Sequence, residues 1–155
     1  MEQITTDKSL IGAAGVHFVV SELSLRGLVA LPTIRNTAGI DVMVVKPRSQ
    51  WHANLQVKTS RTKVGFWPIS TRYEELRGKD NFYVFLRYLK NEHRFEAFLE
   101  SADGVADQTA VVVARERRRG VAEWAPCWYL PREEEERERL GQQWRQFGIG
   151  YFGQW

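Results

Sequence analysis

The stretch NLQVKTSR, residues 54–61, follows the apolar run NTAGIDVMVV at residues 36–45. In a β-strand, residues two apart face the same side, so Gln56 and Lys58 project together. Asp41 opens the earlier run, and it reaches that same face if the two strands pair through the short turn PRSQ. The two stretches therefore predict a polar cluster at the junction of two neighbouring strands.

The bulk composition predicts one folded domain with no membrane span. The chain has 155 residues, of which 43% are hydrophobic, and no apolar run approaches the length of about 18 residues that a span needs. The first ten residues lack the pattern of a secretory signal, so we expect a cytoplasmic protein. A net charge of +3 is compatible with an anionic partner, and we interpret the single cysteine, Cys127, as a small buried apolar residue.

The local patterns predict a helix, a three-stranded meander and a later strand hairpin. Asp7 or Thr6 could cap the first helix, residues 8–26, and Gly27 suits its end. The segment 105–119 fits a helix, although its valine run also fits a strand. The other expected elements are strands at 28–32, 40–46, 52–59, 81–89 and 94–101, an aromatic connection at 64–70, helical turns at 71–78, an irregular segment at 120–131 and a charged helix or tail at 132–148.

The polar cluster has the chemistry of a phosphodiesterase site. Hydrolysis of a phosphodiester needs oxygen ligands for a divalent cation and a positive charge near the phosphate. Asp41, the side-chain oxygen of Gln56 and the carbonyl of Val57 offer the ligands, and Lys58 offers the charge. Taken singly, Asp41 after a glycine is typical of a turn, and Lys58 is typical of a solvated strand end.

Residues 10–61 resemble small bacterial proteins of the PD-(D/E)xK nuclease superfamily. Those proteins show a helix of the type GxxGExxVxxxLxxxG, then an Asp that opens a strand, then QVKT at the end of the next strand, and this chain matches in order and spacing. The resemblance implies an α/β restriction-endonuclease-like fold, a mixed central sheet flanked by helices with an αβββαβ-type core. It implies a nuclease-type domain at residues 1–130, with the charged segment 131–155 packed on it.

The resemblance also implies a function. It implies metal-dependent endonuclease activity on nucleic acid, DNA before RNA, with one or two Mg²⁺ or Mn²⁺ ions. Asp41 matches the metal-binding aspartate, Gln56 the glutamine or glutamate of the third motif, and Lys58 the catalytic lysine.

One position departs from the pattern, because Val16 stands where the family has its helix glutamate. Glu22 lies about 240° around the helix from this position and cannot replace the carboxylate, and His17 is expected to face elsewhere. With one carboxylate left, we expect weaker metal binding. The alternative is a catalytically inactive protein of the same fold that binds nucleic acid or a protein partner.

Basic and aromatic residues near the strand ends are candidates for nucleic-acid contacts. We predict phosphate contacts from Arg35, Arg61 and Lys63, and base stacking on Trp67. Scattered surface charge and core packing would produce the same pattern. A homodimer, and a protein partner for the charged C-terminal helix, are further expectations.

Overall fold

The computed structural model describes residues 7–34, 39–61, 65–120 and 125–149 as a single α/β domain. In these residues a mixed five-stranded sheet has the order β1-β2-β3-β5-β6, and a second sheet joins β4 to β7. The strands of the large sheet are β1 (Val29–Pro32), β2 (Val42–Val45), β3 (His52–Ser60), β5 (Asn81–Leu89) and β6 (Arg94–Ser101). The strand predictions for these segments are confirmed to within two residues at each end.

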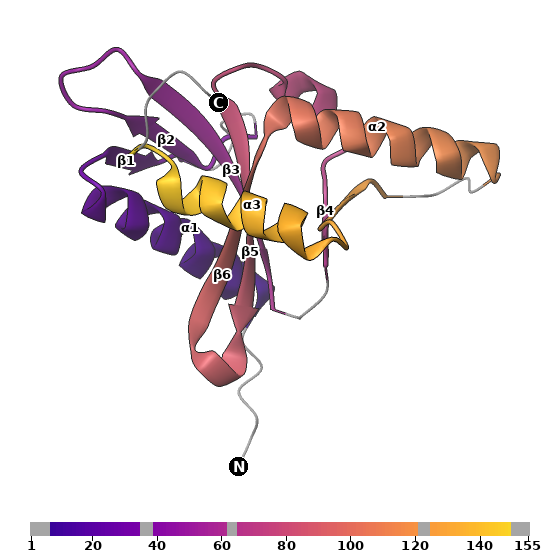
Figure 1. Ribbon diagram of the computed structural model, residues 1–155, viewed down its shortest axis with the longest axis horizontal. Coiled ribbons are helices and arrows are strands. Elements are labelled where there is room, and N and C mark those ends of the chain that lie inside the picture. The colour runs from indigo at the N-terminus through magenta and orange to yellow at the C-terminus, as the bar shows by residue number, and fades with distance from the viewer. Residues whose placement is uncertain (1–6, 35–38, 62–64, 121–124, 150–155) are drawn as a thin grey trace.

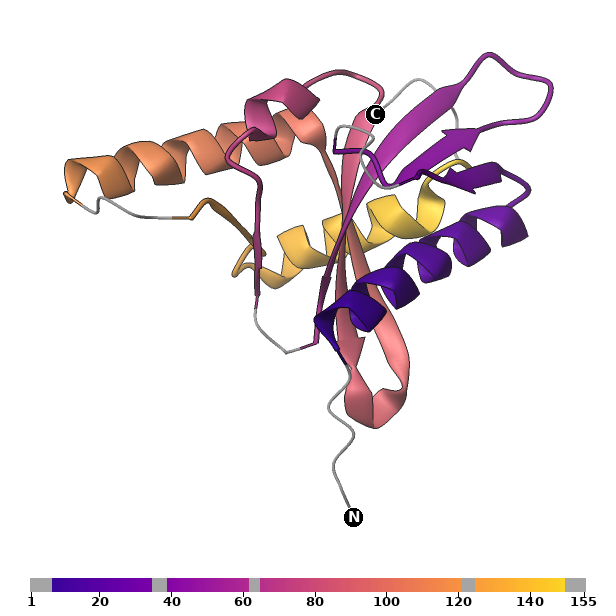
Figure 2. The same ribbon diagram turned by 180° about the vertical axis from the view of Figure 1, so that it is seen from behind.

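Helix α1 (Lys8–Leu25) has the ends that the sequence predicts. The carboxylate of Asp7 accepts a hydrogen bond from the backbone of Ser9 at 2.9 Å, and Gly27 leaves the helix with φ of 80°. A side chain at Gly15 would collide with Thr59 of β3, so this glycine allows α1 to pack closely on the sheet. Viewed from behind, α1 lies along β3, and its first residues lie where β3 ends (Figure 2).

The connection between the parallel strands β3 and β5 differs from the expected αβββαβ order. It consists of the short strand β4 (Phe66–Pro68) and one 3₁₀ turn, η1 (Tyr73–Leu76), where that order has a helix. Gly78 ends the segment with φ of 149°, and only four residues are helical. The predicted helical turns at 71–78 are confirmed, but they are too short to form a crossover helix.

The two faces of the large sheet carry different cores. One face packs aliphatic residues such as Leu55 and Val84 against α1 and against α3 (Glu134–Gln146). The other packs aromatic residues, among them Phe85 and Trp128, whose rings stack with centroids 4.0 Å apart. Helix α3 also contacts β6 along the edge of the sheet and buries Leu140, so the charged C-terminal helix is part of this domain.

Two segments differ from their sequence-based description. Residues expected to be an aromatic connection and an irregular segment form β4 and β7 (Cys127–Tyr129), which pair antiparallel. The valine run belongs to a helix, α2 (Ala102–Arg118), which extends beyond the sheet on the side opposite β1 and β2 (Figure 1). Cys127 is partly exposed and not fully buried. Among the described residues, no helix combines the length and apolar character that crossing a membrane requires.

Candidate nuclease-type site

The site lies where β2 and β3 stop pairing. The backbone N–H of Asp41 donates to the carbonyl of Leu55 at 2.8 Å, just before β2 begins. The side chain of Asp41 then continues the ladder, because its Oδ2 accepts from the Val57 N–H at 2.7 Å and from the Gln56 Nε2 at 3.0 Å. The carboxylate is therefore fixed against β3, as the sequence predicted from the spacing of the two strands.

Lys58 is the charged partner of Asp41. Burial raises the pKa of Asp41 above its ordinary value of 3.8, and the hydrogen bonds from Val57 and Gln56 and the charge of Lys58 offset part of this rise. Burial likewise lowers the pKa of Lys58 below 10.5, and Asp41 opposes that change. Each group is held in a partly desolvated position with the other as its nearest charge compensation.

A cavity of about 460 Å³ lies between α1 and the strand side formed by Asp41 and Val57, which we call the strand wall. Asp41 and Val57 line it on the strand side, and Thr33 and its neighbours close it beyond the end of β1. Its helix side is a stripe of residues one or two turns apart: Ser9, Gly12, Ala13, Val16 and His17. A side chain at Gly12 would meet nothing within 4 Å, so this glycine leaves open space in the cavity instead of packing on a neighbour.

Val16 and His17 both line this cavity. A carboxylate at the position of Val16 would therefore border the same cavity as Asp41. The expectation that His17 faces elsewhere is wrong, because α1 crosses the sheet so that a stripe about two residues wide borders the cavity. Positions 9, 12, 13, 16 and 17 recur at helical spacing, but this spacing indicates a shared stripe only once the packing of α1 on the sheet is known.

The donors at the strand wall fit a divalent ion only in part. Oδ2 of Asp41 is used by Val57 and Gln56, so Oδ1 is the oxygen left for a metal. The carbonyl of Val57 points to the same side of β3 as its N–H, toward Asp41 and the cavity. Gln56 turns its amide nitrogen to Asp41, and its oxygen lies beside Gly39, so in this orientation Gln56 positions the carboxylate.

One carboxylate and one carbonyl agree with the ligand set that Mg²⁺ takes when substrate phosphates and waters complete its shell. The part of the chain that the structure describes holds no cluster of three or more His, Cys, Asp or Glu side chains able to bind a metal. An ion at this site would therefore depend strongly on Asp41.

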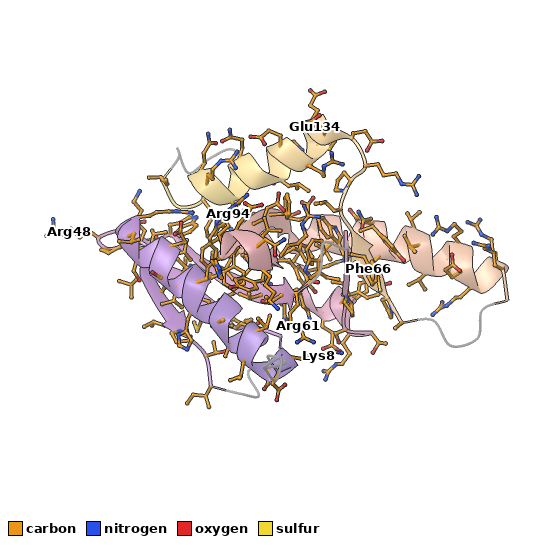
Figure 3. The ribbon with its side chains drawn as sticks, turned by 90° about the horizontal axis from the view of Figure 1, so that it is seen from below. Lys8, Arg48, Arg61, Phe66, Arg94 and Glu134 are labelled. Carbon is orange, nitrogen blue, oxygen red and sulfur yellow. The ribbon has the colours of Figure 1, made fainter. Side chains whose placement is uncertain are left out.

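The predicted nucleic-acid contacts are only partly placed. Arg61 is exposed at the end of β3, near the start of α1, where Figure 3 labels it beside Lys8. Its charge helps to lower the pKa of Asp7, an effect dominated by the hydrogen bonds from Ser9. Arg35 and Lys63 lie outside the described residues.

Trp67 does not stack on bases, and that prediction is wrong. Its side chain is 1% exposed, and its indole N–H donates to the carbonyl of Leu86 at 3.1 Å. The exposed rings in this region are Phe66, which precedes it, and Tyr129 across the β4–β7 pair, with centroids 6.1 Å apart. Neighbouring residues of a strand face opposite sides, which explains why Phe66 is exposed while Trp67 is buried.

The exposed position of Tyr129 beside Phe66 could not be predicted, because the partner strand β4 is distant in sequence. The side chain of Gln108 on α2 holds Tyr129 by two hydrogen bonds of 3.0 Å, one to the backbone N–H and one to the carbonyl of this residue. This amide clamp ties β7 to α2 and fixes Tyr129 beside Phe66, which Figure 3 labels. No local pattern in the sequence indicates such a clamp.

Comparison with protein-family models, with curated proteins and with solved structures gives no match to this chain.

Proposed function

We propose that the chain is a restriction-endonuclease-like domain that hydrolyses phosphodiester bonds of nucleic acid, DNA before RNA, with a divalent metal ion. The observation that carries the proposal is the joining of Asp41 to the Gln56–Val57 segment, with Lys58 as charge partner, beside an open cavity. Hydrogen bonds that only tie the loop before β2 to β3 would not require a cavity of this size beside them.

Asp41 and three consecutive residues of β3, Gln56, Val57 and Lys58, have distinct roles in this proposal. Asp41 and the Val57 carbonyl would hold Mg²⁺ or Mn²⁺, which supplies charge neutralisation and an acidified water when bound. Gln56 keeps the Asp41 carboxylate in one orientation through its hydrogen bond. Lys58 stabilises the negative charge that develops on the phosphate, and its partial burial strengthens that interaction.

A cleavage assay tests this function. The purified protein is incubated with supercoiled plasmid, linear duplex, single-stranded DNA and RNA in Mg²⁺ or Mn²⁺. We expect cleavage by the wild type that is lost in Lys58→Ala and kept in Lys90→Ala, because Lys90 is exposed on the β5–β6 turn. If neither the wild type nor Val16→Glu cuts any substrate, the nuclease proposal is wrong.

A second candidate is a binding module of the same fold without catalysis. Two observations favour it: Val16 offers no ligand to the cavity, and protein donors already occupy one oxygen of Asp41. Nucleic-acid binding that weakens with salt, in the absence of any cleavage, would support it. A homodimer and a protein partner on α3 remain predictions, which sedimentation of the purified protein and pull-down with α3 surface variants can test.

A further inference from the structure

The helix wall of the cavity carries one side chain able to bind a metal. Of the five α1 residues in the stripe, Ser9 is engaged by Asp7, and Gly12, Ala13 and Val16 offer no ligand atom in their side chains. The fifth is His17, which is exposed and makes no hydrogen bond or ion pair with any residue of the described ranges. Its imidazole is available to whatever occupies the cavity.

Three elements therefore bring three different donors to one space. The end of the loop before β2 supplies the carboxylate of Asp41, β3 supplies the carbonyl of Val57, and α1 supplies the imidazole of His17. The remaining hydroxyl on the rim, that of Thr33, donates to the carbonyl of Ile40 at 2.5 Å and is already committed. The donor set is thus one nitrogen and two oxygens, with open volume for water or phosphate.

The combination of one nitrogen donor with two oxygen donors favours some divalent ions over others. Mg²⁺ prefers oxygen ligands, whereas Mn²⁺, Co²⁺, Ni²⁺ and Zn²⁺ accept imidazole readily. We propose that His17 is a nitrogen ligand of the divalent ion held by Asp41, and that the cavity consequently selects a transition-metal ion over Mg²⁺. The inference rests on the proposed metal site and names the ion class that it takes.

The inference is tested by spectroscopy of the metal, independently of cleavage. The protein is titrated with Mn²⁺, and bound ion is followed by electron paramagnetic resonance, with electron spin echo modulation to detect a coordinated ¹⁴N nucleus. We expect ¹⁴N modulation in the wild type and its loss in His17→Ala, together with Mn²⁺ binding weakened at least about tenfold. His52→Ala is the matched control, because His52 lies at the opposite end of β3, near Asp80.

The outcomes separate this inference from the proposed function. Mn²⁺ that binds in an Asp41-dependent manner without ¹⁴N modulation overturns the role of His17 and leaves the metal site in place. Modulation that persists in His17→Ala, or disappears in His52→Ala, also overturns it. If the wild type binds no Mn²⁺, the metal site itself fails. Circular dichroism of His17→Ala checks the fold, which the exposed position of His17 should preserve.

Discussion

The two walls of the cavity differ in chemistry. The strand wall carries the carboxylate of Asp41 and the backbone of Val57, and Lys58, whose charge acts on Asp41, lies on β3 next to Val57 without lining the cavity. The helix wall consists mainly of small or apolar residues, with His17 as its one side chain that can ligate a metal. In the proposed site, metal binding and charge stabilisation would depend on the strands, whereas α1 would determine the space available and the choice of ion.

The pKa shifts of Asp41 and Lys58 make the stability of the fold depend on pH. Because the pKa of Asp41 is raised, the folded state binds its proton more tightly, so this group stabilises the fold more as pH falls through that raised pKa. Because the pKa of Lys58 is lowered, stability rises as pH increases from that lowered pKa toward 10.5. In both groups burial disfavours the charged form, and pKa shifts of this kind are common at functional sites.

The largest expected effect is on catalysis at Lys58. Lys58→Met keeps the length of the side chain and removes its charge, so we expect cleavage to fall by about 10²–10³-fold. Initial rates with Mn²⁺ at saturating DNA measure the effect, with Lys90→Met as control. Equal rates for Lys58→Met and the wild type would show that Lys58 supplies no catalytic charge.

Next in size is the loss of metal binding at Asp41. Asp41→Asn keeps an oxygen able to accept from Val57 and Gln56 but removes the charge, so we expect Mn²⁺ affinity to fall by about 100-fold or more with the fold retained. Asp41→Ala should in addition lower the free energy of unfolding by about 1–3 kcal/mol, because the Val57 N–H loses its acceptor. Calorimetric titration and urea unfolding measure the two quantities. Unchanged Mn²⁺ affinity in Asp41→Asn would show that the metal binds at another site.

Burial of the charges of Asp41 and Lys58 costs free energy, so a double variant that removes both charges should be more stable. Asp41→Asn with Lys58→Met removes both partly buried charges together, so we expect the free energy of unfolding to rise by about 1–4 kcal/mol while activity is lost. Urea unfolding at pH 7 measures it, and each single variant serves as control. A double variant less stable than the wild type would mean that the pair stabilises the fold.

On the helix wall, restoring a carboxylate should strengthen the site. Val16 lines the cavity, so Val16→Glu places a second carboxylate there, and we expect Mg²⁺ affinity to rise by about tenfold. Leu10→Glu, on the exposed side of α1, is the control for an added negative charge. Equal gains in the two variants would attribute the effect to general electrostatics.

The smallest expected effect comes from filling the cavity at Gly12. The Cβ of Gly12→Leu meets no neighbouring atom, and leucine has a higher helix propensity than glycine, so the free energy of unfolding should rise by about 0.5–1 kcal/mol. The new side chain occupies space that a phosphate would use, so nucleic-acid binding should weaken several-fold at constant salt. Gly12→Ala provides the matched control, with most of the stabilisation and little of the blockage. Tighter nucleic-acid binding by Gly12→Leu would show that the ligand avoids this cavity.

The local parts of the fold could be predicted from the sequence. The cap at Asp7, the turn at Gly27 and the strand alternation around Gln56 each depend on neighbouring residues, and the structure has them in place. The pairing of β4 with β7 could not be predicted, because Phe66 and Tyr129 are far apart in sequence and each strand has three residues. The burial of Trp67 could not be predicted for the same reason, because Trp67 packs against Trp128 of the distant strand β7.

The site was predictable where two adjacent strands determine it, as in the bonds from Gln56 and Val57 to Asp41. The part of the site that depends on the packing angle of α1 was not predictable. Whether His17 borders the cavity depends on how α1 crosses the sheet, and the rotation between neighbouring helical positions does not reveal this.

The most direct test of the account is the position of a bound ion. A crystal of the wild-type protein soaked in Mn²⁺ and measured for anomalous scattering should show a peak in the cavity, in contact with Asp41 and the carbonyl of Val57. No such peak is expected in a crystal of Asp41→Asn treated in the same way. An empty cavity in the wild type, or a peak bound only to other residues, would contradict the central claim that the strand wall holds a catalytic metal.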